Sequence, residues 1–388
     1  MNECPYCNYP VKEGWNYCHH CDKPLLVDVK RRSDRNSSYN FSSDHFHPAQ
    51  AQHSSLEERE GYYGPLPEEI REIDAKLSKA ESAGSSIGSL LLKKASLYYR
   101  NGDLSSSLNT LKQANDYFTE EGNVLQASVS HNEMALIHEE RGFYDEALYH
   151  FERSIELLKS LNDIPKLIQV YNNIANVYYL LDELEHSYEY YERALSLAEK
   201  EDLVQEQIKT SSNLVDVLFS LRNHDKIGRI LKRNLDYFQQ VGDLFGTIIT
   251  LVKLGKLNYV LGETHYETAY QYLNRALEVV KKIENKATLD PRQKAELLWE
   301  AFYLLGELHL IWNNDVEAKK FLLKSLEAIR AYQAEQNLLE INVLESLATL
   351  FEIKGDANKA LNYLKKSINI HFKFGEEIFR NIKNPKEF

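Results

Sequence analysis

The chain has 388 residues, of which 43% are hydrophobic and 27% charged, and its formal net charge is −12 at pH 7. This composition excludes a wholly disordered chain, because it provides enough apolar surface for a folded core. The acidic balance disfavours a protein that holds nucleic acid through many phosphate contacts, since such binding requires clustered lysine and arginine. No run approaches the roughly 18 apolar residues of a membrane helix, and the N-terminus lacks a secretory signal pattern, so the sequence predicts a cytoplasmic protein.

All four cysteines lie near the N-terminus, in two CxxC pairs that ten residues separate: Cys4, Cys7, Cys18 and Cys21. Two residues between cysteines let both thiolates of a tight turn bind one ion, and two such turns complete a tetrahedral Zn²⁺ site. Four protein ligands leave no open position for water, so the pattern predicts a structural zinc ion rather than a catalytic one. A redox pair, a disulfide knot, and coordination by His19 or His20 are the alternatives that these residues leave open.

The segment CPYCNYPVKEGWNYCHHC resembles the short zinc ribbons found at the ends of many prokaryotic proteins. Asn8 and Asp22 stand where that family often has glycine, and both residue types tolerate the left-handed conformation. The closing Pro-Leu pair of the family is present at 24–25, so the resemblance implies a zinc-ribbon domain over residues 1–27. Trp15 and Tyr17 could stack on nucleic-acid bases or could simply cover the metal site.

Residues 28–65 are rich in Ser, Asn, Asp, His and Gln and contain few aliphatic side chains. A segment that cannot bury apolar surface does not fold alone, so this composition predicts a disordered linker. A flexible coil of this length spans on the order of 35 Å, which would let the ribbon reach partners beside the following domain.

Beyond residue 65 the sequence repeats with a period of 40, and three columns of equivalent positions carry the repeat. The first column holds small or slim residues: Ala95, Ala135, Ala175, Val215, Gly255, Gly306 and Ala348. The second is a turn column: Gly102, Gly142, Asp182, Arg222, Gly262, Asn313 and Gly355. The third lies in the next helix: Ser107, Ala147, Ser187, Ile227, Ala269, Ala318 and Ala360. Four positions later a large residue follows, from Leu111 to Leu364, and together these columns predict seven stacked helix hairpins.

The run from Tyr171 through Ala175 and Tyr178 to Ala194 resembles the tetratricopeptide repeat (TPR), and similar repeats cover residues 88–374. The resemblance implies an all-α fold: a right-handed TPR-type α-solenoid of about seven helix hairpins over residues 66–388. The period of 40 exceeds the usual TPR length of about 34. In this respect the chain resembles kinesin light chains, spindle-orientation adaptors and bacterial Rap-type regulators, which bind peptides or proteins.

Several further elements complete the predicted array. A preceding helix is expected at residues 66–82 and a short terminal cap at 376–383. The spacing between the fifth and sixth repeats widens to 51, which a turn insertion near Thr264 and a loop at 286–289 explain. Asp290 followed by Pro291 has the sequence of a helix cap and first helical residue.

The candidate binding surface follows from the TPR resemblance, which implies that the first helix of each hairpin lines a concave wall. Asparagine is a mediocre helix former, yet it recurs on adjacent first helices. Its amide suits the exposed backbone of an extended peptide, and lysine can pair with a carboxylate. The candidate peptide-binding residues are Asn132, Gln169, Asn172, Asn173, Asn176, Lys209, Asn213, Asp216, Lys253 and Lys256. The alternative is an ordinary polar face that contacts only water.

The sequence contains no metalloprotease, serine-hydrolase, phosphate-loop or dinucleotide-binding motif, which disfavours an enzyme. We expect a cytoplasmic, non-enzymatic scaffold or adaptor that binds a protein or peptide segment, with structural Zn²⁺ as its cofactor and the ribbon as a tethered second contact. The alternative is a regulator of a signalling or nucleic-acid-associated complex in which the ribbon contacts nucleic acid. The Rap-type resemblance also leaves open the stimulation of response-regulator dephosphorylation, although no residue marks such a site.

Overall fold

A computed structural model describes residues 2–3, 10–11, 68–80, 87–284, 290–332 and 338–383. Two short antiparallel strands near the N-terminus, β1 (Asn2–Glu3) and β2 (Pro10–Val11), pair with each other. The four cysteines of the predicted zinc site and the whole of the predicted linker lie outside the described residues. All other described elements are helical, and these helices form two compact units, α2–α6 and α7–α16.

The first unit contains five helices: α2 (Glu68–Ala80), α3 (Ile87–Arg100), α4 (Leu104–Glu120), α5 (Val124–Glu140) and α6 (Tyr144–Leu161). The second contains α7 (Ile164–Leu180), α8 (Leu184–Lys200), α9 (Val204–Ser220), α10 (His224–Val241), α11 (Leu244–Val260), α12 (Tyr266–Glu284), α13 (Pro291–Ile311), α14 (Asp315–Tyr332), α15 (Leu339–Ile353) and α16 (Ala357–Lys383). A 3-10 turn, η3 (Glu263–His265), precedes α12 at the turn insertion that the sequence predicts. Across the described ranges, no helix combines the length and the apolar character needed to cross a bilayer.

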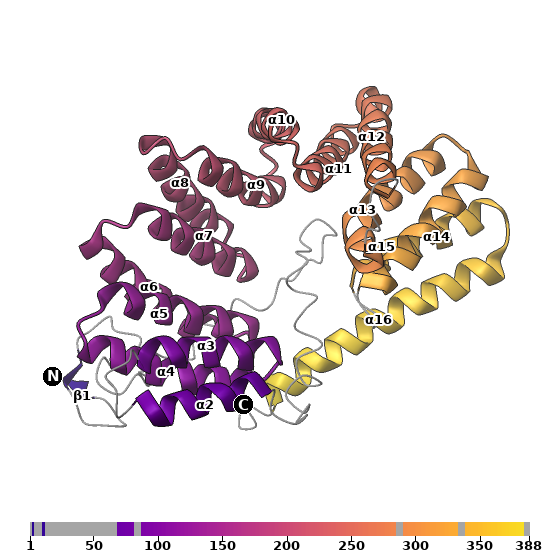
Figure 1. The fold of residues 1–388 in the computed structure, drawn as a ribbon. Helices are drawn as coiled ribbons and strands as arrows, with labels where there is room; N and C mark the ends of the chain where they lie inside the picture. Colours follow the sequence, from indigo (N-terminus) through magenta and orange to yellow (C-terminus); the bar gives the residue numbers. More distant parts are fainter. Residues whose placement is uncertain are drawn as a thin grey trace. The chain divides into compact units, whose positions relative to one another are not determined.

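Consecutive helices pack as hairpins, which confirms the predicted architecture (Figure 1). The pairs are α3/α4 and α5/α6 in the first unit, and α7/α8, α9/α10, α11/α12, α13/α14 and α15/α16 in the second. The expected helix before the first hairpin is α2, which packs on α3 through Ile70 and Ile73. The fold is therefore an all-α, TPR-like arrangement of seven hairpins.

Helices end and restart at residues with left-handed backbone conformation. From Gly102 to Gly262 a positive φ recurs every 20 residues: Gly102, Gly122, Gly142, Asn162, Asp182, Asp202, Arg222, Gly242 and Gly262. Every member of the predicted turn column is among the positive-φ residues, including Asn313 and Gly355. An Asp or Asn often follows the turn and caps the next helix, as when Asp103 Oδ1 accepts a hydrogen bond of 2.9 Å from the Ser106 amide. Each 40-residue repeat is thus two 20-residue units of one helix and one turn.

The small-residue columns lie in the core of each hairpin, as predicted. Ser107 Oγ donates a hydrogen bond of 2.8 Å to the carbonyl of Ala95, and Ser187 Oγ donates one of 2.7 Å to the carbonyl of Ala175. These equivalent bonds need a close approach of the two helix backbones, which only small side chains permit. At Gly255 the contact is tight, because an added Cβ would lie 2.5 Å from the Leu273 side chain.

The C-terminal end differs from the prediction. Helix α16 runs without a break through residues 376–383, so the expected separate terminal cap is wrong. Leu364, a member of the large-residue column, is 41% exposed, whereas its counterparts Leu273 and Leu322 are fully buried. The counterparts are covered by a following hairpin, and in the part of the chain that the structure describes no hairpin follows α16.

Candidate binding surface on the inner helices

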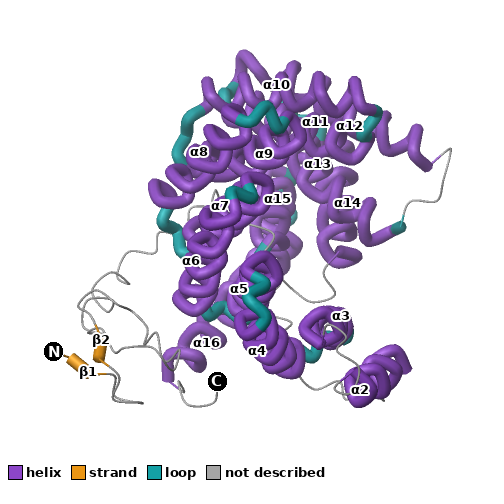
Figure 2. Tube along the Cα trace, turned by 60° about the vertical axis from the view of Figure 1, so that its left-hand side comes forward, coloured by secondary structure: helices purple, strands orange, loops and turns teal. Residues whose placement is uncertain are grey.

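In the second unit the first helices of the hairpins lie on one side and the second helices on the other (Figure 1, Figure 2). Neighbouring first helices contact each other directly, as α7 contacts α9 and α11 contacts α13. We call α7, α9, α11, α13 and α15 the inner helices and their partners the outer helices. A ligand that crosses several hairpins would meet the inner helices in succession.

Each of α7, α9 and α11 leaves one narrow stripe of side chains exposed or half-buried. The members occupy equivalent positions 40 residues apart: Gln169, Asn173, Asn176 and Leu180 in α7, Lys209, Asn213, Asp216 and Ser220 in α9, and Ile249, Lys253, Lys256 and Val260 in α11. We call these residues the inner stripe. Their spacing of three or four residues places each set on one face of its helix.

The inner stripe contains eight of the candidate residues, and the structure buries the other two. Asn172 in α7 donates a hydrogen bond of 2.9 Å to Thr210 Oγ1 of α9. Asn132 belongs to α5 in the first unit and donates a hydrogen bond of 3.3 Å to the Glu133 carboxylate. Both are less than 9% exposed, although the sequence pattern assigns them to the open face. A shift of one residue turns a helix by about 100°, which moves these amides from the stripe into the contact with neighbouring helices.

Two ion pairs tie the inner helices together. Lys253 Nζ of α11 lies 2.7 Å and 2.8 Å from the carboxylate oxygens of Asp216 in α9. Lys256 Nζ of α11 lies 2.8 Å from Glu300 Oε1 of α13 and 5.2 Å from the centre of the Phe219 ring. Burial alone would lower the pKa of Lys256, but the Glu300 carboxylate outweighs this effect and raises the pKa above its ordinary value. Each lysine is paired with a carboxylate, so neither is a spare cation for a partner's carboxylate.

The neighbouring tyrosine hydroxyls are engaged within the fold. Burial, followed by the negative charge of Asp216, raises the pKa of Tyr179 to about 12, and its hydroxyl hydrogen-bonds to Ser220. The Tyr191 hydroxyl donates a hydrogen bond to Asn176 Oδ1. Asn176 therefore presents to a ligand the amide groups that this bond leaves unused.

Three stripe residues keep unused hydrogen-bonding groups. Gln169 and Lys209 are exposed and Asn213 is half-buried, and within the described ranges none of them makes a hydrogen bond or ion pair. An amide that is not engaged in the fold can bond to the backbone of an extended peptide through its donor and acceptor at once. These three residues are therefore the best polar contacts that the stripe offers.

The sequence analysis misses the apolar members of the stripe. Ile249 and Val260 are each 46% exposed, and Phe245, one turn before Ile249, is similarly exposed. They stand 40 residues after Lys209, Ser220 and Gln205. An apolar residue at a position that is polar in the preceding repeat is the signal that could have revealed them.

Comparisons with known proteins agree with this fold. Residues 125–200 match a family model for the tetratricopeptide repeat. A search of curated proteins found no match. Residues 125–200 therefore carry the helix-hairpin repeat of this family.

Solved structures show the same architecture at low sequence identity. A signal transduction ATPase (STAND protein) with a tetratricopeptide repeat sensor from Pyrococcus horikoshii superposes with a TM-score of 0.59 at 17% identity, covering 87% of this chain and 49% of that one. The apo form of RapI gives a TM-score of 0.54 at 14% identity, covering 74% of this chain and 99% of that one. A tetratricopeptide repeat protein from Parabacteroides merdae gives 0.50 at 15% identity, covering 73% and 93%. At these identities the likeness establishes the fold alone.

Proposed function

We propose that the chain is a non-enzymatic scaffold that binds an extended protein segment along the inner stripe of α7, α9 and α11. The observation that carries the proposal is the composition of the stripe, which sets unengaged polar groups beside exposed apolar side chains on consecutive inner helices. Ile249 and Val260 stay exposed to water unless a ligand covers them, so burying them would favour binding. TPR proteins in general bind peptides and proteins, which supports the same reading.

The inner stripe would bind its ligand through hydrogen bonds and through apolar contacts. Gln169 and Asn213 would bond to the backbone of the bound segment, which gives affinity for many sequences. Ile249 and Val260 would cover apolar side chains, at about 25 cal/mol for each Å² of apolar surface removed from water. Asp216 and Glu300 neutralise the lysines of α11, which leaves Lys209 of α9 as the cation that the stripe offers. We therefore expect selection mainly by apolar pattern, with one carboxylate of the ligand able to pair with Lys209.

Peptides selected from a random displayed library on the full-length protein provide the test. Replacing Gln169→Ala together with Asn213→Ala should weaken their binding by roughly fivefold to a hundredfold, because each lost hydrogen bond costs about 0.5 to 1.5 kcal/mol. The matched control is Gln239→Ala with Gln240→Ala, which removes two exposed amides from the outer helix α10.

A second pair of variants tests the apolar contacts. Ile249→Ala should weaken the same peptides, whereas Val204→Ala, also at a residue that is 46% exposed but lies outside the stripe of α9, should not. Neither change should lower the melting temperature, since neither side chain is in the core. Equal binding by all four variants and the wild type would contradict the proposal, and the contact surface would then lie elsewhere.

We also propose that Cys4, Cys7, Cys18 and Cys21 hold one structural zinc ion and that this N-terminal segment is a second contact for partners. The support is the sequence pattern of two CxxC pairs, since four thiolates match the preferred tetrahedral coordination of Zn²⁺. With all four positions taken by protein, such an ion would stabilise the segment and would not activate water.

A further inference from the structure

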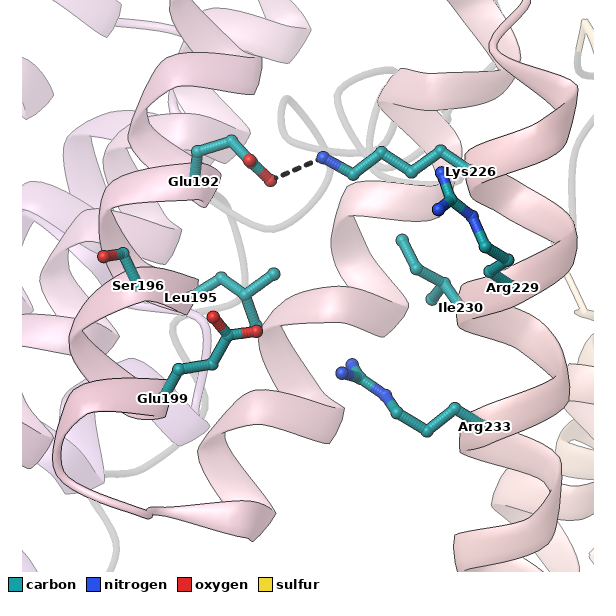
Figure 3. Close-up of a pocket in the computed structure, with 8 residues that line it drawn as sticks. All are labelled: Glu192, Leu195, Ser196, Glu199, Lys226, Arg229, Ile230 and Arg233. Atoms are coloured by element: carbon teal, nitrogen blue, oxygen red, sulfur yellow. Dashed lines mark hydrogen bonds and ion pairs between the residues drawn. The ribbon is translucent and has the colours of Figure 1, made fainter.

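A cavity of about 360 Å³ lies between the outer helices α8 and α10 of the second unit (Figure 3). Its lining comes in equal parts from the two helices: Glu192, Leu195, Ser196 and Glu199 of α8, and Lys226, Arg229, Ile230 and Arg233 of α10. Both sets have the spacing i, i+3, i+4, i+7, so one face of each helix forms one wall. We call this the outer cavity.

One end of the outer cavity is held by a fixed bridge between its walls. Lys226 Nζ lies 2.9 Å from Glu192 Oε1 and donates a hydrogen bond of 2.8 Å to the Tyr188 hydroxyl. The same ammonium lies 4.8 Å from the centre of the Tyr188 ring. Burial would lower the pKa of Lys226, but these hydrogen bonds raise it above its ordinary value, so the bridge persists at neutral pH.

The middle of the cavity is apolar. Leu195 of α8 and Ile230 of α10 are both nearly buried, and Figure 3 shows their side chains between the two charged walls. An apolar floor below charged walls distinguishes this site from a purely electrostatic patch, because it can cover a hydrophobic side chain of a ligand.

Two guanidinium groups in the cavity are not used by the fold. Arg229 and Arg233 are exposed, and within the described residues neither makes a hydrogen bond or an ion pair. They stand one helical turn apart on α10, roughly 5 to 6 Å between their Cβ atoms, and Figure 3 shows Arg233 reaching into the gap opposite Glu199. In the same view the Arg229 side chain runs toward Lys226, so a rotation of exposed Arg229 would be needed for both groups to meet one ligand. Planar guanidinium groups bind carboxylates through paired hydrogen bonds, so each of these arginines can receive an acidic side chain.

The charge balance of the cavity narrows the class of ligand. Lys226 and Glu192 neutralise each other, which leaves two arginines against the single carboxylate of Glu199. Glu199 opposes any anion, so charge alone does not select between ligands, but inorganic phosphate would leave the apolar floor of Leu195 and Ile230 uncovered. A nucleic-acid strand would meet the same carboxylate in a chain of net charge −12.

We propose that the outer cavity binds an acidic segment of a partner protein, with an Asp or Glu carboxylate held by Arg229 and Arg233 and an adjacent apolar side chain on Leu195 and Ile230. The site is separate from the inner stripe, because it lies on different helices and offers two arginines where the stripe offers Lys209. A scaffold with both sites would hold two different segments at once.

The test uses the full chain and a fluorescent peptide built from Glu-Leu pairs, with binding followed by fluorescence anisotropy. Arg229→Ala together with Arg233→Ala should weaken binding by about tenfold to a hundredfold or more, the range for loss of hydrogen bonds to a charged group. Glu199→Gln should strengthen binding, since it removes the opposing charge. A peptide with Gln for Glu, and another with Ala for Leu, should each bind more weakly than the parent.

The single variant Arg233→Ala is compared with the matched control Lys232→Ala, which also removes one positive charge from an exposed residue of α10 but does not line the cavity. The control should change the affinity by less than about threefold. Equal losses of affinity in Lys232→Ala and in Arg233→Ala would show general attraction to α10 and overturn the proposal. So would absence of peptide binding, or binding of phosphate or succinate as tight as that of the peptide. Normal binding by Gln169→Ala with Asn213→Ala would show that the peptide does not occupy the inner stripe, so the two proposals can fail separately.

Discussion

Gly255 offers the sharpest test of how the hairpins are packed. It occupies the small-residue column of α11, where four of the seven repeats carry alanine, so the sequence alone suggests that Gly255→Ala is harmless. In the structure an added Cβ would lie 2.5 Å from Leu273 Cδ2 and 2.6 Å from Leu273 Cγ. Ordinary carbon contacts are about 3.5 to 4.0 Å, and Leu273 is fully buried, so its side chain has no free space to enter.

The expected magnitude is a difference between two opposing effects. Adding a methyl group to a filled core typically costs about 1 to 3 kcal/mol. Replacing glycine by alanine inside a helix contributes about 1 kcal/mol in the other direction. Gly255→Ala should therefore lower the free energy of unfolding by up to about 2 kcal/mol, despite the better helix former.

Gly228→Ala is the matched control, because an added Cβ there would lie 3.6 Å from its nearest neighbour, an ordinary contact. This variant should gain about 1 kcal/mol from helix propensity. Urea unfolding followed by circular dichroism compares the two, and Leu273→Ala should cost less in the Gly255→Ala background than alone. If both glycine variants stabilise the protein equally, the close approach of α11 and α12 is refuted.

Two further predictions concern the pH response and the metal. Burial first, then nearby cations, lowers the pKa of His138 to about 4, and burial with the neighbouring His131 lowers that of His150 to about 2. Both are neutral when folded but protonated in the unfolded chain below about pH 6.5, so the first unit should lose stability as pH falls from there to about 4. Burial raises the pKa of Glu139 to about 7, and this effect opposes the loss of stability. The melting temperature of His150→Asn, compared with that of the wild type across this pH range, isolates the contribution of His150. If the two proteins lose the same number of degrees as the pH falls, His150 makes no such contribution. Native mass spectrometry should find one Zn²⁺ per chain, and chelation should leave the helical signal intact; a metal-free protein with four free thiols would contradict the site.

The repeat architecture could be predicted from the sequence because its determinants are local. A left-handed turn needs a residue that tolerates positive φ, and the residue types of Gly102, Asp182 and Asn313 each indicate such a turn from the sequence alone. The sequence also shows a second turn column, at Gly122, Asn162, Asp202 and Gly242. With this column included, the repeating unit of one helix and one turn is 20 residues long. The small-residue columns indicate where the two helices of a hairpin pack closely, since a bulky side chain there would separate the backbones.

The functional surfaces depend on the tertiary structure. Asn172 and Asn173 are neighbours of the same type, and only the packing of α7 against α9 decides that the first is buried and the second half-exposed. The sequence likewise offers Lys253 as a free cation until the fold brings Asp216 within 2.7 Å.

The outer cavity illustrates the same division. Its arginines and its apolar floor are visible in the sequence as amphipathic faces of two helices, separated by 34 residues between Glu192 and Lys226 or between Glu199 and Arg233. Periodicity indicates which side of a helix is buried. The gap between α8 and α10, in contrast, depends on the angle at which two hairpins pack on each other. That angle results from the packing of many side chains and not from a local sequence motif.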